Sequence, residues 1–155
     1  MSKINSYKDL IVWQRAIDIA VEVYKITKKF PSDEIFGLTS QVRRASYSVS
    51  LNIAEGHGRN TTKSFLNFLR IAKGSLDELE SGFILATRLE FVKEEELKKL
   101  NDSITQEMKM LVSLIKVLEL KVKKKTKKIA KIITTIIAIA ALPIAYSLFT
   151  NPQLF

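Results

Sequence analysis

The chain has 155 residues, of which 46% are hydrophobic and 26% charged, with no cysteine and one histidine, His57. This composition fits a compact globular protein and excludes a disulfide scaffold, a thiolate nucleophile and a cysteine-rich or multi-histidine metal site. The net charge of +9 is uneven, because residues 1–120 carry 18 basic and 16 acidic side chains, whereas residues 121–155 carry seven lysines and no acid.

Two helices are predicted before residue 60. Between residues 7 and 30, apolar side chains recur every three or four positions, which is the period of one helical face. This first stripe consists of Leu10, Trp13, Ile17, Ala20, Val21 and Tyr24. Pro31 ends the helix, since the residue before proline disfavours the helical conformation. A second helix begins near Glu34 or Thr39 with the stripe Leu38, Val42, Ala45, Val49 and Ile53, and we expect Gly56 and Gly58 to end it in left-handed conformations.

Two more helices follow. Asn60, Thr61 or Thr62 caps the third, which runs to a break near residues 90–93. Its stripe is Phe65, Phe68 or Leu69, Ala72, Leu76, Leu79, Phe83, Ala86 and Leu89, and that of the fourth is Leu97, Leu100, Ile104, Met108, Leu111, Leu114 or Ile115, and Leu118. Four long helices with short connections predict an all-α, antiparallel up-and-down four-helix bundle over residues 1–119.

Six cations on the second and third helices are candidates for nucleic-acid binding. They are Arg43, Arg44, Arg59, Lys63, Arg70 and Lys73. Aligned cations bind a polyanion by releasing its counterions, so a stripe of this kind would contact phosphates. The alternative is a solvated face, or pairing with the acids Glu55, Asp77, Glu78 and Glu80. A net charge of only +2 over residues 1–120 favours that alternative unless several copies assemble.

Other polar residues have simpler roles than catalysis. Asn52 and Glu55 flank the apolar line of the second helix, so at least one is expected to be partly buried and to need partners, and a catalytic carboxylate is the alternative. His57 is expected to be a helix-end residue, and Gly74 to permit close approach of another helix. We expect no enzyme activity, cofactor, metal or small-molecule substrate.

Three residues off the main stripes are candidates for a subunit contact: Tyr47, Leu51 and Phe91.

The middle of the chain carries a recognisable motif. The second helix ends in Asn52-Ile53-Ala54-Glu55-Gly56-His57-Gly58-Arg59, and the third contains Gly74-Ser75-Leu76-Asp77-Glu78-Leu79-Glu80. With Trp13 and the segment 38–45, these residues resemble the four-helix bundle family encoded in intervening sequences of 23S ribosomal RNA genes. The resemblance covers roughly residues 6–118. It departs at Ser50, where the family usually has proline, and at Leu51, where it has a small polar residue, so the second helix is expected to lack a kink.

The resemblance implies a cytosolic protein without enzymatic activity that assembles into a ring, commonly a pentamer. The family is similar to accessory proteins of diversity-generating retroelements, which are associated with a reverse transcriptase and nucleic acid. By that analogy, a ring of bundles binds RNA or DNA or serves as a ribonucleoprotein assembly platform.

The C-terminal part has a different composition. Residues 120–131 form a polybasic linker with Lys121, Lys123, Lys124, Lys125, Lys127, Lys128 and Lys131, and residues 132–155 form a hydrophobic tail whose residues 132–149 lack any charge. Eighteen residues reach the lower limit for spanning a membrane, and lysines on one flank only predict a cytoplasmic bundle tethered to the inner face of the membrane. No signal-peptide pattern occurs among the first 30 residues. The alternatives are a soluble assembly module with the tail buried in the oligomer, or a tail without function.

Overall fold

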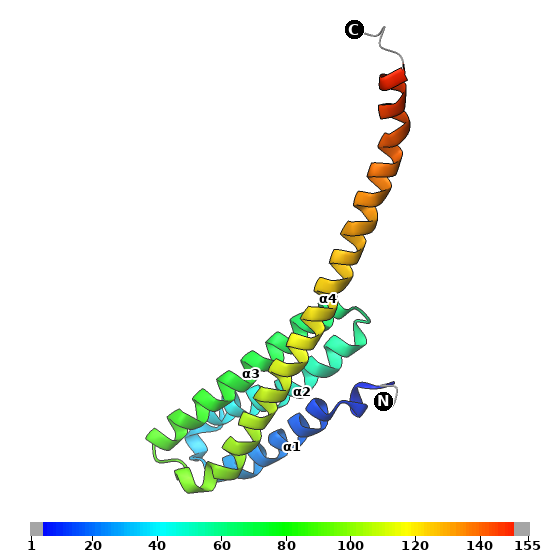
Figure 1. The fold of residues 1–155 in the computed structure, drawn as a ribbon. Helices are drawn as coiled ribbons and strands as arrows, with labels where there is room; N and C mark the ends of the chain where they lie inside the picture. Colours follow the sequence, from blue (N-terminus) through cyan, green and yellow to red (C-terminus); the bar gives the residue numbers. More distant parts are fainter. Residues whose placement is uncertain (1–4, 151–155) are drawn as a thin grey trace. The chain divides into compact units, whose positions relative to one another are not determined.

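The computed structural model describes residues 5–150, with side chains for residues 5–140. In that range the regular elements are all helical (Figure 1). They are the α-helices α1 (Ile11–Ile26), α2 (Leu38–Gly58), α3 (Thr62–Arg88) and α4 (Glu94–Thr150), and short 3-10 turns at Tyr7–Asp9, Thr27–Lys29 and Ser32–Ile35. The chain divides into two units, Met1–Leu118 and Glu119–Phe155.

The first unit is a four-helix bundle in which neighbours in sequence are neighbours in space. α1 packs on α2 and α2 on α3. α4 packs between α1 and α3 and completes the bundle. Glu107 on α4 lies 3.5 Å from Arg15 on α1, and residues of α3 and the first turns of α4 line one shared depression. The predicted all-α, antiparallel bundle is therefore confirmed. Its largest fully buried apolar side chains are Val23, Val42, Val49, Ile53, Leu69, Leu76, Leu79, Phe83, Leu100 and Leu111.

The face of α1 that enters the core differs from the predicted one. The buried residues are Val12, Ala16, Ile19, Ala20, Val23 and Ile26, whereas Ile17, Val21 and Tyr24 of the predicted stripe are exposed. Both sets repeat at helical spacing, so the period alone does not choose between them. The small Ala16 and Ala20 sit on the inner face, where neighbouring helices pack closely.

The glycines also play roles other than those predicted. Gly56 lies inside α2, and a Cβ there would be 2.6 Å from Cβ of Phe68, so this glycine permits the contact with α3. The left-handed residue after α2 is Asn60, with φ of 56°, and no described glycine has a positive φ. Gly74 faces open space, so its predicted role is wrong; Gly82 makes a close approach instead, to Val42.

Local signals in the sequence explain most helix ends. Thr61 caps α3, because its Oγ1 accepts a hydrogen bond from the backbone N–H of Ser64 at 3.1 Å. α3 ends before Glu90, whose positive φ of 60° turns the chain towards α4. α2 runs through Ser50 as one helix from Leu38 to Gly58, as expected for a chain without proline at that position.

Candidate functional site

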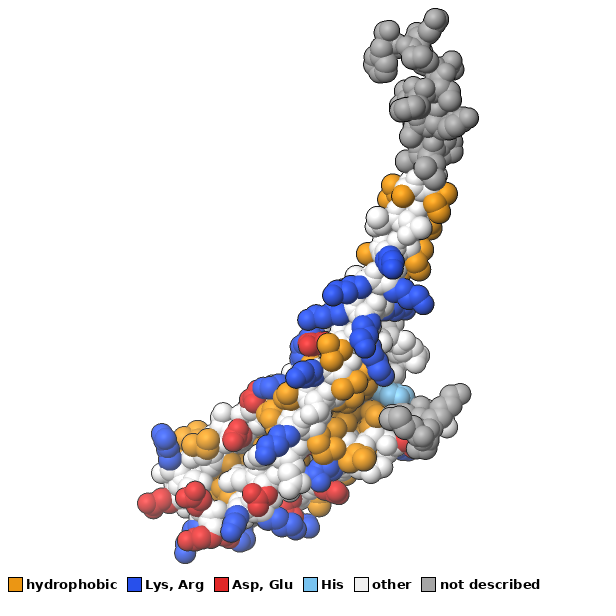
Figure 2. Space-filling model, viewed as in Figure 1, with side chains coloured by type: hydrophobic (Ala, Val, Ile, Leu, Met, Phe, Trp, Pro, Cys, Tyr) orange, Lys and Arg blue, Asp and Glu red, His pale blue; other side chains and the backbone are white. Residues whose placement is uncertain are grey.

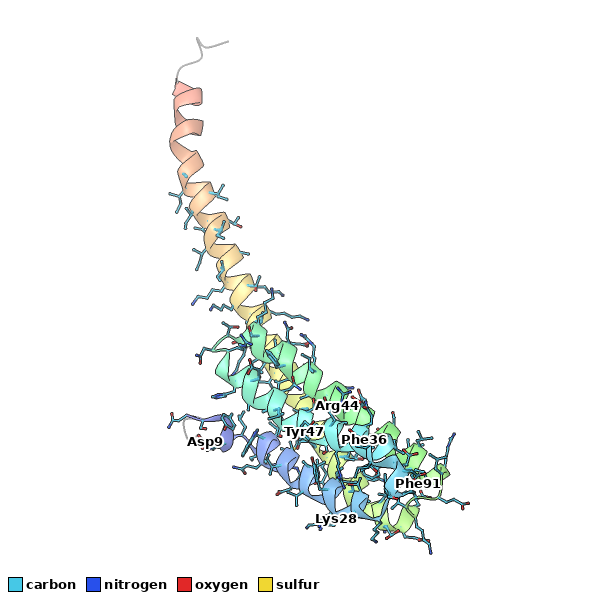
Figure 3. All side chains as sticks on the ribbon, turned by 180° about the vertical axis from the view of Figure 1, so that it is seen from behind. Asp9, Lys28, Phe36, Arg44, Tyr47 and Phe91 are labelled. Carbon is cyan, nitrogen blue, oxygen red and sulfur yellow. The ribbon has the colours of Figure 1, made fainter. Side chains whose placement is uncertain are left out.

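The first two members of the predicted cationic stripe, on α2, lie against different neighbouring helices. Nε of Arg43 donates a hydrogen bond to Oγ1 of Thr27 at 2.8 Å, and its guanidinium lies 4.9 Å from the centre of the Tyr24 ring. Arg43 therefore faces α1. Arg44, labelled in Figure 3, faces α3, where its Nη2 lies 3.9 Å from Oε1 of Glu78.

Two further cations pair with carboxylates one turn away on the helix. Arg59 lies 2.6 Å from Glu55, and Lys73 lies 2.8 Å from Asp77. Such exposed pairs stabilise a helix only slightly, by about 0.3–0.5 kcal/mol each. The carboxylates do reduce the net positive charge that a nucleic acid would meet at these positions. This is the alternative to phosphate binding that was considered from the sequence, in which the cations pair with nearby acids.

The last two members lie on the exposed side of α3. Nη1 of Arg70 donates a hydrogen bond to Oδ1 of Asn67 at 3.4 Å, and Lys63 is exposed in the first turn of the helix. Arg43 thus lies against α1, Arg44 and Arg59 lie against side chains of α3, and the other three cations belong to α3 itself. Binding of nucleic acid by these residues stays a prediction.

The polar residues at the end of α2 have structural partners. Asn52 is half-buried, and its Nδ2 donates hydrogen bonds to the carbonyl oxygen and Oγ of Ser48 at 2.8 and 3.0 Å, which confirms the predicted partial burial. His57 lies in the last turn of α2 with its ring edge-on to Phe65, 6.1 Å between ring centres. No group of three His, Cys, Asp or Glu side chains that would hold a metal occurs among the described residues.

An exposed apolar surface lies where α1 meets α2, and we call it the α1–α2 apolar band. It consists of Ile17, Val21, Tyr24, Tyr47 and Leu51. The first three follow each other at helical spacing along the outside of α1, and the last two do so along α2. The contact of Arg43 with the Tyr24 ring joins the two rows. Tyr47 and Leu51 were predicted as off-stripe residues, and Leu51 is 60% exposed.

Aromatic residues in the connections behave in two ways. Phe36, between the Ser32–Ile35 turn and α2, is 94% exposed, and the adjacent Ile35 is exposed as well (Figure 3). No signal in the helical pattern singled out Phe36, because it lies outside every stripe. Phe91 is half-buried, with its ring centre 5.8 Å from that of Phe30, so one side of the ring packs inside the bundle. Its role in a subunit contact stays a prediction.

The most unusual buried group is Glu107, in the part of α4 that belongs to the bundle. Its side chain is 0% exposed, and neither carboxylate oxygen has a hydrogen-bond partner. Desolvation raises the pKa of Glu107 from its ordinary value of 4.5 to about 7, although the charge of Arg15 acts in the opposite direction. The sequence pattern placed Met108 in the core at this level, and Met108 is only half-buried.

The second unit exposes first lysines and then isoleucines. All seven lysines predicted to contact a membrane surface lie in the helical part and are exposed: Lys121, Lys123, Lys124, Lys125, Lys127, Lys128 and Lys131. Figure 2 shows them as a block of basic side chains followed by hydrophobic ones. Those hydrophobic side chains are Ile129, Ile132, Ile133, Ile136, Ile137 and Ile139, all exposed.

Among the described residues, no helix combines the length and the apolar character needed to cross a membrane. The span predicted at residues 132–149 lies partly outside these residues, because side chains are described only to residue 140.

Together these features define a class: an antiparallel four-helix-bundle protein with an exposed apolar band, whose last helix, α4, continues into a basic C-terminal segment. A family model described as "23S rRNA-intervening sequence protein" matches residues 8–113, and the chain belongs to this family. The predicted resemblance is therefore confirmed. The matched range ends in α4 before the first of the seven lysines.

A similar solved structure is a protein of unknown function from the S23 ribosomal protein family of Bacteroides thetaiotaomicron. It is 27% identical, with a TM-score of 0.64, and the match covers 68% of this chain and 99% of that chain. No curated protein matches the sequence.

Proposed function

We propose that this chain is a non-enzymatic helical-bundle protein that assembles with further copies of itself, and that its C-terminal helix attaches the assembly to the cytoplasmic face of a membrane. The observation that carries the assembly is the α1–α2 apolar band. Exposed apolar side chains gathered in one region are unfavourable in water, and on soluble proteins large apolar patches mark sites of interaction.

The composition of the band favours a protein partner. Tyrosine and arginine are among the residue types most enriched in the central, energetically important part of protein interfaces. The band contains Tyr24 and Tyr47, and the guanidinium of Arg43 lies over the Tyr24 ring. Leu51 stands where the family usually has a small polar residue, and it adds apolar area to this surface.

A ring, as the family resemblance implies, requires a contact between two different faces of neighbouring copies. Phe36 and Ile35 supply a second exposed apolar site, next to the acids Asp33 and Glu34. The basic side chains near the band are Arg43, which contacts the Tyr24 ring, and the exposed Lys28, in the 3-10 turn that follows α1. An acidic site with an apolar centre on one copy therefore complements an apolar band with basic neighbours on the next.

The test is the mass of the full-length chain in solution, measured by analytical ultracentrifugation in a mild detergent. We expect a multiple of 17.6 kDa for the wild type. Substituting Tyr47→Asp and Leu51→Asp should give monomers, because two charges would be buried without partners. The matched control carries Ile136→Asp and Ile137→Asp in the second unit, and it should keep the wild-type mass.

The same pair of variants separates this proposal from its main alternative, a soluble module with the C-terminal helix buried inside the oligomer. In that case the control, and not the band variant, would become monomeric. If the wild-type chain were monomeric, both assembly through the apolar band and assembly around a buried C-terminal helix would be wrong.

Nucleic-acid binding is the second role that we propose, and one observation favours it. The side chains of Arg44 and Arg59 stay 64% and 59% exposed although each lies near a carboxylate. Repeated around a ring, these cations would present many weak phosphate contacts, so binding would be non-specific and strongly dependent on salt.

A further inference from the structure

The second unit carries seven lysines and one acid, Glu119, so negative charge from outside the chain would stabilise it. No acidic residue follows Glu119 in the sequence. Four pairs of these lysines are spaced by four residues, and like charges at that spacing face each other on a helix and destabilise it. The first pair is Lys121 and Lys125, and the last is Lys127 and Lys131. A polyanionic partner would remove this repulsion.

The residues that follow the lysines form an isoleucine face. The six isoleucines between residues 129 and 139 are spaced by one, two or three residues, so at about 100° per residue they fall within one half of the helix circumference. All of them are exposed. The other half holds Ala130, Lys131, Thr134, Thr135 and Ala138.

The polar side of this segment does not require water for its hydroxyl groups. Oγ1 of Thr134 donates a hydrogen bond to the carbonyl oxygen of Ala130 at 2.9 Å, and Oγ1 of Thr135 donates one to the carbonyl oxygen of Lys131 at 2.9 Å. A hydroxyl satisfied within its own helix tolerates an apolar environment. Lys131 is then the one charged group between residues 129 and 140, and its long side chain can reach a polar boundary.

Three partners could supply negative charge or apolar contact to this helix: a second copy of it, a single-stranded nucleic acid, or a lipid bilayer. The observations above favour the bilayer. A second copy of the same helix in parallel would bring two sets of seven lysines together. Single-stranded nucleic acid is bound largely by stacking on aromatic side chains and arginine, and residues 119–140 contain neither. A bilayer with acidic headgroups offers both negative charge and an apolar interior, in the order in which the lysines and isoleucines occur.

Building on the membrane attachment proposed above, we infer that residues 121–140 bind anionic phospholipid bilayers, with the lysines at the headgroups and the isoleucine face in the acyl-chain region. Both parts contribute to affinity. Charge attraction selects acidic lipid, and burial of the isoleucines holds the helix after the charges are screened.

The experiment measures flotation of the full-length chain with vesicles of phosphatidylcholine alone and of phosphatidylcholine mixed with phosphatidylglycerol. We expect capture mainly by the mixed vesicles. Changing Lys123, Lys124 and Lys125 to Gln should weaken that capture by about 100-fold, because each lysine near an acidic surface contributes a factor of about five. The matched control changes three exposed lysines of the bundle to Gln, and its capture should equal that of the wild type: Lys98, Lys109 and Lys116.

A second variant tests the isoleucine face. With Ile132, Ile136 and Ile137 changed to Ser, the lysines are intact, so capture should survive at low salt and be lost at high salt, whereas the wild type should keep part of its binding. Unfolding of the bundle does not confuse this result, because these residues lie in the second unit.

Three outcomes would overturn the inference. Equal capture by neutral vesicles would remove the selectivity for acidic lipid and leave membrane attachment in place. Capture by neither kind of vesicle would remove the attachment as well, without affecting assembly through the apolar band, which is measured separately. Displacement from mixed vesicles by a small amount of RNA, abolished by the lysine substitutions, would assign the lysines to nucleic acid.

Discussion

Replacing Glu107 by Gln is expected to stabilise the bundle at alkaline pH and to flatten its dependence on pH. The folded chain raises the pKa of this carboxyl from 4.5 to about 7 by burying it. Between these two values the folded state binds a proton that the unfolded state has released. The contribution of this carboxyl to the free energy of unfolding is therefore fully present below pH 4.5. It is lost as the pH rises to about 7, and it does not return at higher pH.

The size of the effect follows from the shift. A difference of one pKa unit corresponds to 1.36 kcal/mol, so the rise from 4.5 to about 7 corresponds to a loss of about 3 kcal/mol of unfolding free energy. Gln has nearly the same volume and carries no charge. We expect the Glu107→Gln variant to exceed the wild type by about 2–3 kcal/mol at pH 8, by about 1 kcal/mol at pH 5, and to match it only below pH 4.5.

The assay is urea unfolding of the full-length chain at several pH values between 5 and 8 and at one protein concentration, followed by circular dichroism and by Trp13 fluorescence. Glu55→Gln is the control, because Glu55 is an exposed carboxylate on α2 and its loss should change stability little at any pH. If the Glu107→Gln variant kept the pH dependence of the wild type, the buried carboxylate would not be its source and the reasoning would be refuted.

Two other predictions concern packing and charge. Gly56→Ala should destabilise the chain by about 1–3 kcal/mol in urea unfolding, because the added Cβ would lie 2.6 Å from Phe68, whereas Gly74→Ala should stabilise it by about 0.5–1 kcal/mol, since nothing lies near that position. Equal effects at the two glycines would contradict the helix contact described here. Changing the six cations of the predicted stripe to Gln should reduce both the affinity for a labelled oligonucleotide and its salt dependence, measured by fluorescence anisotropy. Unchanged binding would leave the stripe as a solvated surface.

The sequence predicted the helices and the bundle because the signals for both are local. Pro31, the cap at Thr61 and the break after α3 are short-range features, and three of the four inward stripes were correct at most positions. The lysines and isoleucines of the second unit were equally clear from composition. The residues of the family motif showed the family without any knowledge of their contacts.

Packing decided the features that the period of a helix leaves open. α1 carries apolar side chains on two adjoining faces, and only its contacts with α2 and α4 determine that Ala16 and Ala20 lie inside while Ile17 and Val21 form an external band. Whether a glycine faces a neighbouring helix, as Gly56 does, depends likewise on the rotation of two helices about their axes.

Glu107 shows the same limit for a charged residue. Its neighbour Met108 fitted the apolar pattern better, and a pattern assigns charged residues to the outside. The crossing of α1 and α4 places Arg15 beside Glu107 and removes its carboxylate from water. The sequence by itself determined which segments are helical and which carry charge, because both depend on neighbours within a few residues. The tertiary structure decided which faces are buried and which groups meet, because those depend on residues about 90 positions apart, such as Arg15 and Gln106, whose side chains are joined by a hydrogen bond of 2.8 Å.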